Sequence, residues 1–254
     1  WALLLINLIK YPFFEFGPRY ASATGESLLH GYKKLGKGVL ITYFILTFAT
    51  MFSIQTAVTI VTAGIASSFF GFGSLVLWTA VITSICFCVL ILGRYKVLDS
   101  LMKGIVIVLT VSTLIAVVLA IRPDTTFDFT QHIPSDALSV AFLIAFMGWM
   151  PAPLDISIWH SIWTVEKRKI NPSITRKQSR FDFNIGYAAT IILGISFIAL
   201  GAIVMNGSGE HFSAQGDVFA NQLISMYTFS LGQHAKIIIG IAALTTMFST
   251  SLTS

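Results

Sequence analysis

Long apolar stretches separated by short polar segments dominate the sequence. Seven of them have about the ~20 residues that an α-helix needs to cross a bilayer. They cover approximately residues 1–19, 38–65, 74–93, 100–121, 136–163, 183–205 and 234–254. A further stretch, 213–230, is moderately amphipathic and predicts a short external helix. The pattern predicts an all-α integral membrane protein with about seven transmembrane helices.

The fifth apolar stretch is interrupted by Met150-Pro151-Ala152-Pro153-Leu154-Asp155. Two prolines two residues apart remove two backbone donors, so a helix cannot run straight through them. Backbone groups freed inside a bilayer are costly unless protein, water or an ion satisfies them. Broken helices hold substrates in secondary transporters, although a proline kink between packed helices is the other interpretation. We expect two half-helices with irregular backbone between about Trp149 and Asp155.

Side chains around this break have the chemistry of a metal site. Met147 and Met150 share a helix face, and their soft thioethers favour Mn or Fe over Mg or Ca. Pro153 suits the first position of a new helix, which would put Asp155 in its first turn. Capping and ligation are both open for Asp155, and simple packing is open for the methionines. For His160, proton relay and ordinary hydrogen bonding are both open.

Two other apolar stretches contain polar residues. The first includes Lys10 and Glu15, and ionisable residues inside a membrane are functional hypotheses by default. Arg19 can pair with Glu15 four residues earlier, so Glu15 is either structural or functional. We interpret Lys10 as structural or as reaching a polar cavity. The second stretch has hydroxyl residues at spacings of three, for which we favour helix packing over an aqueous pathway with Thr56 as its candidate. They are Thr47, Thr50, Ser53, Thr56, Thr59 and Thr62.

The composition supports the membrane assignment. The chain is 55% hydrophobic and 11% charged, with a mean hydropathy of +0.82. Soluble domains have about 25% charged residues. The two cysteines, Cys86 and Cys88, lie in one apolar run and indicate neither a disulfide framework nor a metal cluster. The net charge of +5 does not indicate nucleic-acid binding, because the basic residues divide between loops by side.

Basic residues are concentrated in alternate loops. The loops after the first, third and fifth apolar stretches contain 13 of the 16 lysines and arginines. The positive-inside rule places loops 20–37, 94–103 and 166–180 in the cytoplasm of a multi-pass protein, in a plasma or bacterial inner membrane. The chain begins at Trp1 without an initiator Met, and we expect it to be incomplete at both ends.

Four stretches carry a family resemblance. Residues 19–28, 93–99 and 180–184, together with Gly148-Trp149-Met150-Pro151, follow one another in a characteristic order and spacing. They resemble the end of helix two, the loop before helix five, the entry to helix seven and the Met-Pro-His-Asn motif of helix six in the Nramp (natural resistance-associated macrophage protein) family of divalent-metal transporters. On this resemblance the chain covers helices two to eight of about eleven.

The resemblance implies a LeuT-like fold of two inverted five-helix repeats in one transmembrane domain. Residues 1–121 would be the rest of the first repeat (helices two to five) and residues 136–254 the start of the second (helices six to eight). It also implies secondary-active transport of a divalent metal, Mn²⁺- or Fe²⁺-like or in some relatives Mg²⁺, at the unwound centre of helix six. The metal would be the substrate of a non-enzymatic protein without a cofactor. Its partners would be that ion and the lipid bilayer.

In the family, helix six supplies a Met side chain and a backbone carbonyl one turn earlier. These roles fall on Met150 and the carbonyl of Met147. The other usual ligands, in an Asp-Pro-Gly-Asn motif on helix one, would precede Trp1.

The chain also departs from the family pattern. Ala152 and Pro153 replace the His-Asn that follows Met-Pro, and the acidic residues of family helix three have no equivalents in residues 38–65. We therefore expect weak or no proton coupling, with Asp155, His160 and Glu15 as the remaining candidates. An amino-acid or organic-cation transporter of the same architecture, and a non-transporting membrane sensor, are the alternatives.

Overall fold

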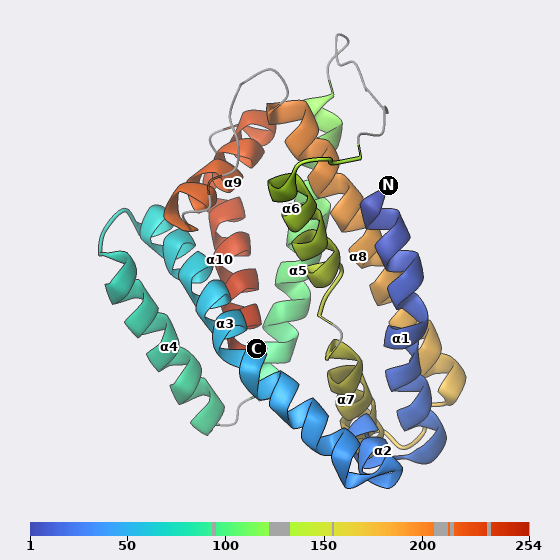
Figure 1. Cartoon of the computed structure of the whole chain (residues 1–254). Coiled ribbons are helices and arrows are strands. Elements are labelled where there is room, and N and C mark those ends of the chain that lie inside the picture. The colour runs from blue at the N-terminus through green and yellow to red at the C-terminus, as the bar shows by residue number, and fades with distance from the viewer. Residues whose placement is uncertain are drawn as a thin grey trace. The chain divides into compact units, whose positions relative to one another are not determined.

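The computed structural model describes residues 1–92, 95–121, 133–153, 155–205, 213, 216–232 and 235–253. These residues form ten α-helices, and no β-strand occurs among them (Figure 1). The helices are α1 (Ala2–Thr24), α2 (Leu28–Leu35), α3 (Lys37–Phe70), α4 (Leu75–Leu92), α5 (Tyr95–Ala120), α6 (Ala137–Trp149), α7 (Ile156–Ile170), α8 (Arg176–Met205), α9 (Gly216–Leu231) and α10 (Ala235–Thr253). The all-α prediction is confirmed.

The loops in the structure are shorter than those that the hydropathy pattern predicts. Residues 20–37, expected as a loop, contain the end of α1 and all of α2, and α5 begins at Tyr95 rather than near residue 100. Most of 166–180 is helical as well, since α7 ends at Ile170 and α8 begins at Arg176. Apolar runs mark only the lipid-compatible part of a helix. The last turn of α7 contains three basic residues, which stabilise the carbonyl end of a helix, so it continues into the polar region.

Several described helices have the apolar character of membrane spans. Lys37–Phe70 and Arg176–Val204 are long and apolar enough to cross a bilayer. Shorter apolar helices lie within α4, α5, α6 and α10. Large apolar side chains are exposed along these helices, for example Phe142, which is 72% exposed. Such continuous exposed apolar surface suits lipid rather than water.

The chain divides into two compact units, each built from two separate segments. One contains residues 1–48 and 127–195, and the other contains residues 49–126 and 196–254. The break between α6 and α7 and the whole of α1 lie in the first unit. The division into repeats 1–121 and 136–254 concerns internal symmetry and stays a prediction.

In the second unit, hydroxyl residues of α3 pack against α10. Thr59 and Thr62 are buried, and Thr62 Oγ1 lies 2.9 Å from Ser251 Oγ. Gln55 Nε2 donates to the carbonyl oxygen of Ser251 at 3.2 Å. This part of the hydroxyl row therefore supports the packing interpretation, since small polar side chains let helices approach closely. Thr56, the pathway candidate, is exposed.

In the first unit, α1 packs closely against α7. A Cβ atom on Gly17 would overlap the carbonyl oxygen of Ser157, so the backbones meet where a larger side chain has no room. Ser157 Oγ donates to the carbonyl of Phe13 at 2.8 Å. The amide of Leu28 donates to Ser161 Oγ at 2.9 Å, which fixes the start of α2. Both serines of α7 therefore hold neighbouring helices together.

Candidate functional site

The helix is interrupted where the two prolines predict. α6 ends at Trp149 and α7 begins at Ile156 (Figure 1), and Met150, directly after α6, has an extended backbone. Pro151 has no N–H to offer the carbonyl of Met147 four residues earlier, and Pro153 has none for the carbonyl of Trp149. Two helical hydrogen bonds within one turn are therefore impossible here. The break leaves backbone oxygens that need partners from elsewhere.

A lysine from α1 supplies two of these partners. Lys10 is only 6% exposed, and its Nζ donates to the carbonyl of Gly148 at 2.7 Å and to that of Ala152 at 3.2 Å. The ammonium thus joins backbone on both sides of the cis Met150–Pro151 peptide bond. The sequence indicated a structural role or a polar cavity for Lys10. Its contacts with the break connect residues 138 and 142 positions apart, which no local pattern encodes.

The two candidate methionines are half-buried. Met150 Cε lies 2.5 Å from the position that a Cβ on Gly194 would take, and the Leu3 side chain borders the same gap. The thioether of Met150 therefore packs into a space that α8 leaves open by having a glycine there. Met147 lies one turn earlier on α6. The structure brings Met150 and Lys10 to the same break, and ligation by Met147 and Met150 stays a prediction.

Asp155 occupies the N-cap position of α7 rather than its first turn. The interruption between Trp149 and Ile156 agrees with the expected bounds, but the new helix begins at Ile156 and not at Pro153. The Asp155 carboxylate makes no capping hydrogen bond, while its backbone carbonyl accepts from the amide of Ile158 at 2.9 Å. Capping therefore does not account for this half-buried acid, and ligation stays open.

Glu15 belongs to an ion-pair cluster between α1 and α8. Its side chain is 7% exposed, with Oε2 3.5 Å from Arg19 Nη1 and Oε1 3.3 Å from Arg180 Nε. The pairing with Arg19 is confirmed. Sequence reasoning missed Arg180, because a contact between residues so far apart leaves no local signal. Two arginines hold this carboxylate, which supports the structural role of Glu15.

A separate ion pair outside the predicted spans joins an exposed lysine, Lys34, to a half-buried glutamate, Glu26. Lys34 Nζ lies 2.6 Å from Glu26 Oε2. This hydrogen bond lowers the pKa of the Glu26 carboxyl below its ordinary value and raises the pKa of Lys34. Water screens such pairs, so they contribute little to stability.

His160 lies in an aromatic cluster between α7 and α8. Its ring centroid is 5.6 Å from that of Phe183 and 5.7 Å from that of Trp163. The ring nitrogen Nδ1 is buried and has no hydrogen-bond partner within the part of the chain that the structure describes. His160 therefore faces aromatic side chains, whereas Ser157 and Ser161 bond to α1 and α2.

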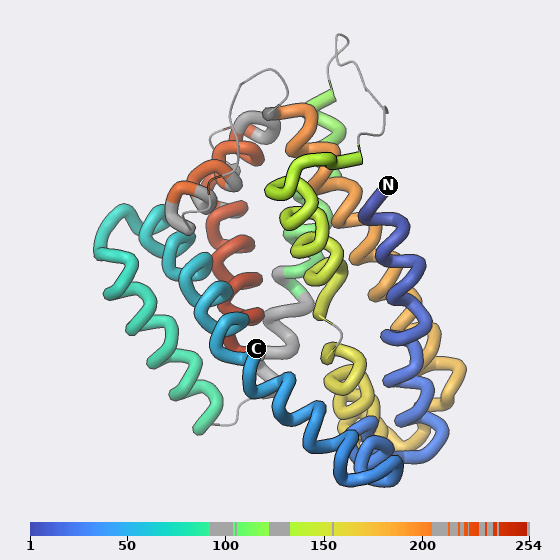
Figure 2. Tube along the Cα trace, viewed as in Figure 1, coloured from blue at the N-terminus to red at the C-terminus, as the bar shows by residue number. Residues whose placement is uncertain are grey.

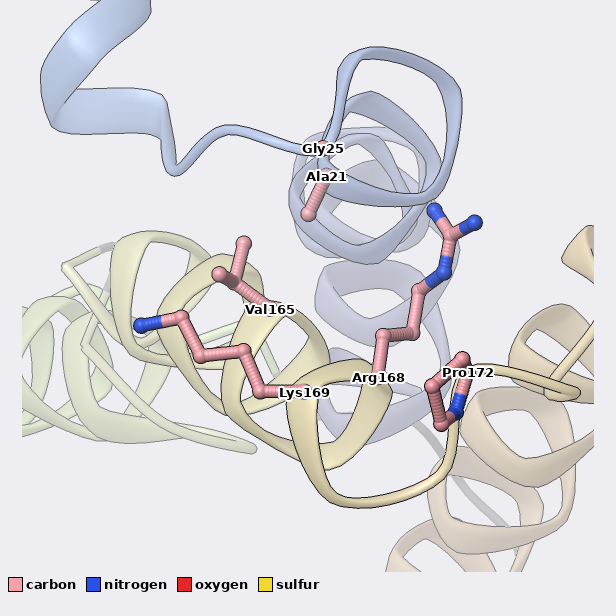
Figure 3. Close-up of a pocket in the computed structure, with 6 residues that line it drawn as sticks. All are labelled: Ala21, Gly25, Val165, Arg168, Lys169 and Pro172. Carbon is pink, nitrogen blue, oxygen red and sulfur yellow. The ribbon is translucent and has the colours of Figure 1, made fainter.

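A shallow cavity of about 270 Å³ lies where the C-terminal ends of α1 and α7 meet (Figure 3). Its lining consists of Ala21, Gly25, Val165, Arg168, Lys169 and Pro172. The guanidinium of Arg168 points toward α1, where Nη1 donates to the carbonyl of Ser22 at 2.9 Å. That charge compensates the carbonyl end of α1, which accounts for the arginine without a ligand.

Two comparisons with known proteins each cover essentially the whole chain. The family described as "Natural resistance-associated macrophage protein-like" matches residues 1–254. The "Uncharacterized protein PM0681" of Pasteurella multocida (strain Pm70) is 36% identical over 258 residues. That alignment covers 99% of this chain and 59% of the relative, so the chain spans little more than half the length of the protein it matches.

Proposed function

Because the chain belongs to the Nramp family, whose members are membrane transporters, we propose that it is part of a secondary-active transporter that holds a divalent metal ion between α6 and α7. The observation that carries this proposal is the position of Lys10. Its ammonium is held by the carbonyl oxygens of Gly148 and Ala152, so the break already accommodates positive charge. Buried positive charge in a membrane requires such partners.

Three groups at the break are suitable ligands. The carbonyl of Met147 cannot receive a helical hydrogen bond from Pro151, and the carboxylate of Asp155 makes no capping bond. The thioether of Met150 would reach the ion by rotating out of the gap beside Gly194. A set that combines sulfur with oxygen suits Mn²⁺ or Fe²⁺ better than Mg²⁺, which prefers oxygen alone.

Transport by the full-length protein in proteoliposomes tests this assignment. We expect Met150→Ala to reduce uptake of Mn²⁺ and Cd²⁺ more than uptake of Mg²⁺ or Ca²⁺, because the hard ions scarcely use sulfur. Met51→Ala is the matched control, since Met51 lies exposed on α3. Equal losses for every ion would assign Met150 to packing and contradict its role as a ligand.

Proton coupling is expected to be weak or absent. Glu15 is paired with two arginines, which leaves Asp155 and His160 as candidates. The measurement is metal-driven acidification of proteoliposomes containing the full-length protein. Robust proton flux in wild type would contradict this expectation, and flux that persists in an Asp155→Asn, His160→Ala double variant would place the pathway elsewhere.

The orientation follows from the basic loops, which we propose to be cytoplasmic. Ser173 is exposed between α7 and α8, and Ser208 lies outside the described residues. In a protein whose native cysteines are replaced, we expect a membrane-impermeant thiol reagent added outside cells to label Ser208→Cys but not Ser173→Cys. The reverse pattern would overturn the topology.

One observation favours a second function, transport of an organic cation. The cation at the break is a primary alkylammonium, the Lys10 side chain, and its two carbonyl contacts suit an amine as well as a metal. Uptake of a labelled alkylamine that Mn²⁺ does not inhibit would favour this alternative. Inhibition of Mn²⁺ uptake by Cd²⁺ but not by ethylammonium would favour the metal.

A further inference from the structure

Lys10 places a positive charge at the break, and its partners there are backbone carbonyls and not carboxylates. Its ammonium contacts two backbone carbonyls, and no ion pair joins it to a carboxylate in the ranges that the structure describes. Gly148 lies in the last turn of α6, where the aligned peptide dipoles concentrate negative potential. The break therefore stabilises a cation through carbonyl oxygens and the helix end.

The position of this charge conflicts with that of a bound metal. A divalent ion ligated by the Met147 carbonyl and by Met150 would be held by residues that flank Gly148, to which Lys10 is bonded. Like charges a few ångströms apart repel strongly in a site shielded from water. The ammonium and the metal therefore exclude one another, and the side chain must withdraw when the ion enters.

We propose that Lys10 is a tethered cation that holds the carbonyls of Gly148 and Ala152 between transport events and excludes the divalent ion from the neighbouring ligands by charge repulsion. This inference rests on the proposed function and adds a residue that sets the affinity of the site. The lysine stem is long and flexible, so its ammonium can leave the carbonyls without movement of α1. When the metal leaves, Lys10 returns and satisfies the oxygens again, which keeps the unloaded break free of unpaired polar groups.

Removing the charge of Lys10 is expected to strengthen metal binding, whereas a substitution that merely disrupts the fold would weaken it. In the full-length protein, we expect Lys10→Met to lower the apparent dissociation constant for Mn²⁺ by about tenfold or more, because the competing charge is removed. Lys10→Arg keeps the charge and is expected to bind Mn²⁺ about as weakly as wild type. Lys33→Met is the matched control, since Lys33 is an exposed lysine of α2.

A second measurement uses the wild-type protein and does not depend on a variant that folds. The rate at which formaldehyde and a borohydride reagent methylate the Lys10 amine, followed by mass spectrometry, is expected to rise severalfold in saturating Mn²⁺. The amine is then displaced from its carbonyl partners, whereas the labelling of Lys33 stays constant.

These results separate the inference from the proposed function. If wild type binds and transports Mn²⁺ while Lys10→Met binds it equally or more weakly and Lys10 labelling is unaffected by the metal, then Lys10 is only a structural pin and the inference is overturned. If neither wild type nor Lys10→Met binds any divalent ion, the proposed function fails as well. If Lys10→Met binds Mn²⁺ more tightly than wild type and Lys10→Arg binds it about as weakly as wild type, the inference and the proposed function are both supported.

Discussion

Two segments of the first unit contain paired prolines, and the pairs have opposite effects. Pro12 and Pro18 lie inside the continuous helix α1, whereas Pro151 and Pro153 separate α6 from α7 (Figure 2). The first pair is six residues apart, so helical hydrogen bonds can form between the two prolines. The second pair is two residues apart, and both lost bonds fall in the same turn. Spacing, rather than the number of prolines, determines where the backbone opens.

The donors to backbone carbonyls also differ between the two segments. Close to the prolines of α1, neutral hydroxyls are the donors: Tyr187 to the carbonyl of Asn7 at 2.7 Å, and Ser157 to that of Phe13 at 2.8 Å. At the break the donor is the Lys10 ammonium. One segment therefore uses proline within a packed helix, and the other presents carbonyl oxygens to a charge. The break therefore differs from α1 in combining an opened backbone with a cation that its carbonyls hold.

The largest expected effect comes from closing the break. Replacing Pro151 and Pro153 with alanine restores two backbone donors, so α6 and α7 can join and the carbonyls turn back into the helix. We expect Mn²⁺ uptake to fall on the order of tenfold to a hundredfold, as when the support of a metal ligand is removed. The matched double variant Pro12→Ala, Pro18→Ala should retain most uptake. Equal losses in the two double variants would remove the distinction between the segments.

A second effect concerns the contact that holds α1 beside α7. Gly17→Ala places a Cβ against the carbonyl oxygen of Ser157, and the helices must separate to accept it. We expect this change to destabilise the protein by about 1–3 kcal/mol. Gly38→Ala is the control, because nothing lies within 4 Å of a Cβ there. Thermal unfolding in detergent compares the two variants. Identical midpoints for Gly17→Ala and Gly38→Ala would show that α1 and α7 have room for a Cβ at Gly17.

A smaller effect is expected where α8 accommodates Met150. Gly194→Ala fills the gap that holds Met150 Cε, so the thioether loses its packed position and is freer to turn toward the break. We predict that the Mn²⁺ dissociation constant falls by roughly threefold while that for Mg²⁺ is unchanged, since removing a competing conformer raises apparent affinity. Gly186→Ala on the same helix has open space and serves as the control. An equal change for both ions would assign the effect to general distortion.

The smallest effect is expected from either arginine of the Glu15 cluster alone. Both guanidinium groups are largely exposed, and each of Arg19→Gln and Arg180→Gln leaves the other in place. We expect each single change to cost less than about 1 kcal/mol of stability. The double change should cost more than the sum, because it leaves the carboxylate buried without a partner. A double-mutant cycle measured by thermal unfolding would show whether the two act independently.

Sequence periodicity predicted the helices because a membrane span needs a long apolar run, and proline chemistry predicted the break without tertiary information. The short helix α2 was missed, since its eight residues carry no spanning signal and its start is fixed by Ser161 from α7. Arg180 and the contacts of Lys10 were missed for the same reason: each joins residues more than a hundred positions apart. An intramembrane lysine was the visible signal, but its partners depend on how α1 packs.

We propose that the break between α6 and α7 holds a divalent ion with sulfur from Met150 among its ligands. X-ray absorption spectroscopy of Cd²⁺ bound to the full-length protein tests it most directly, because the soft ion reveals whether sulfur is coordinated. We predict a sulfur neighbour in wild type and in Met51→Ala, and only oxygen or nitrogen neighbours in Met150→Ala. A wild-type spectrum without sulfur, or one unchanged in Met150→Ala, would contradict the account.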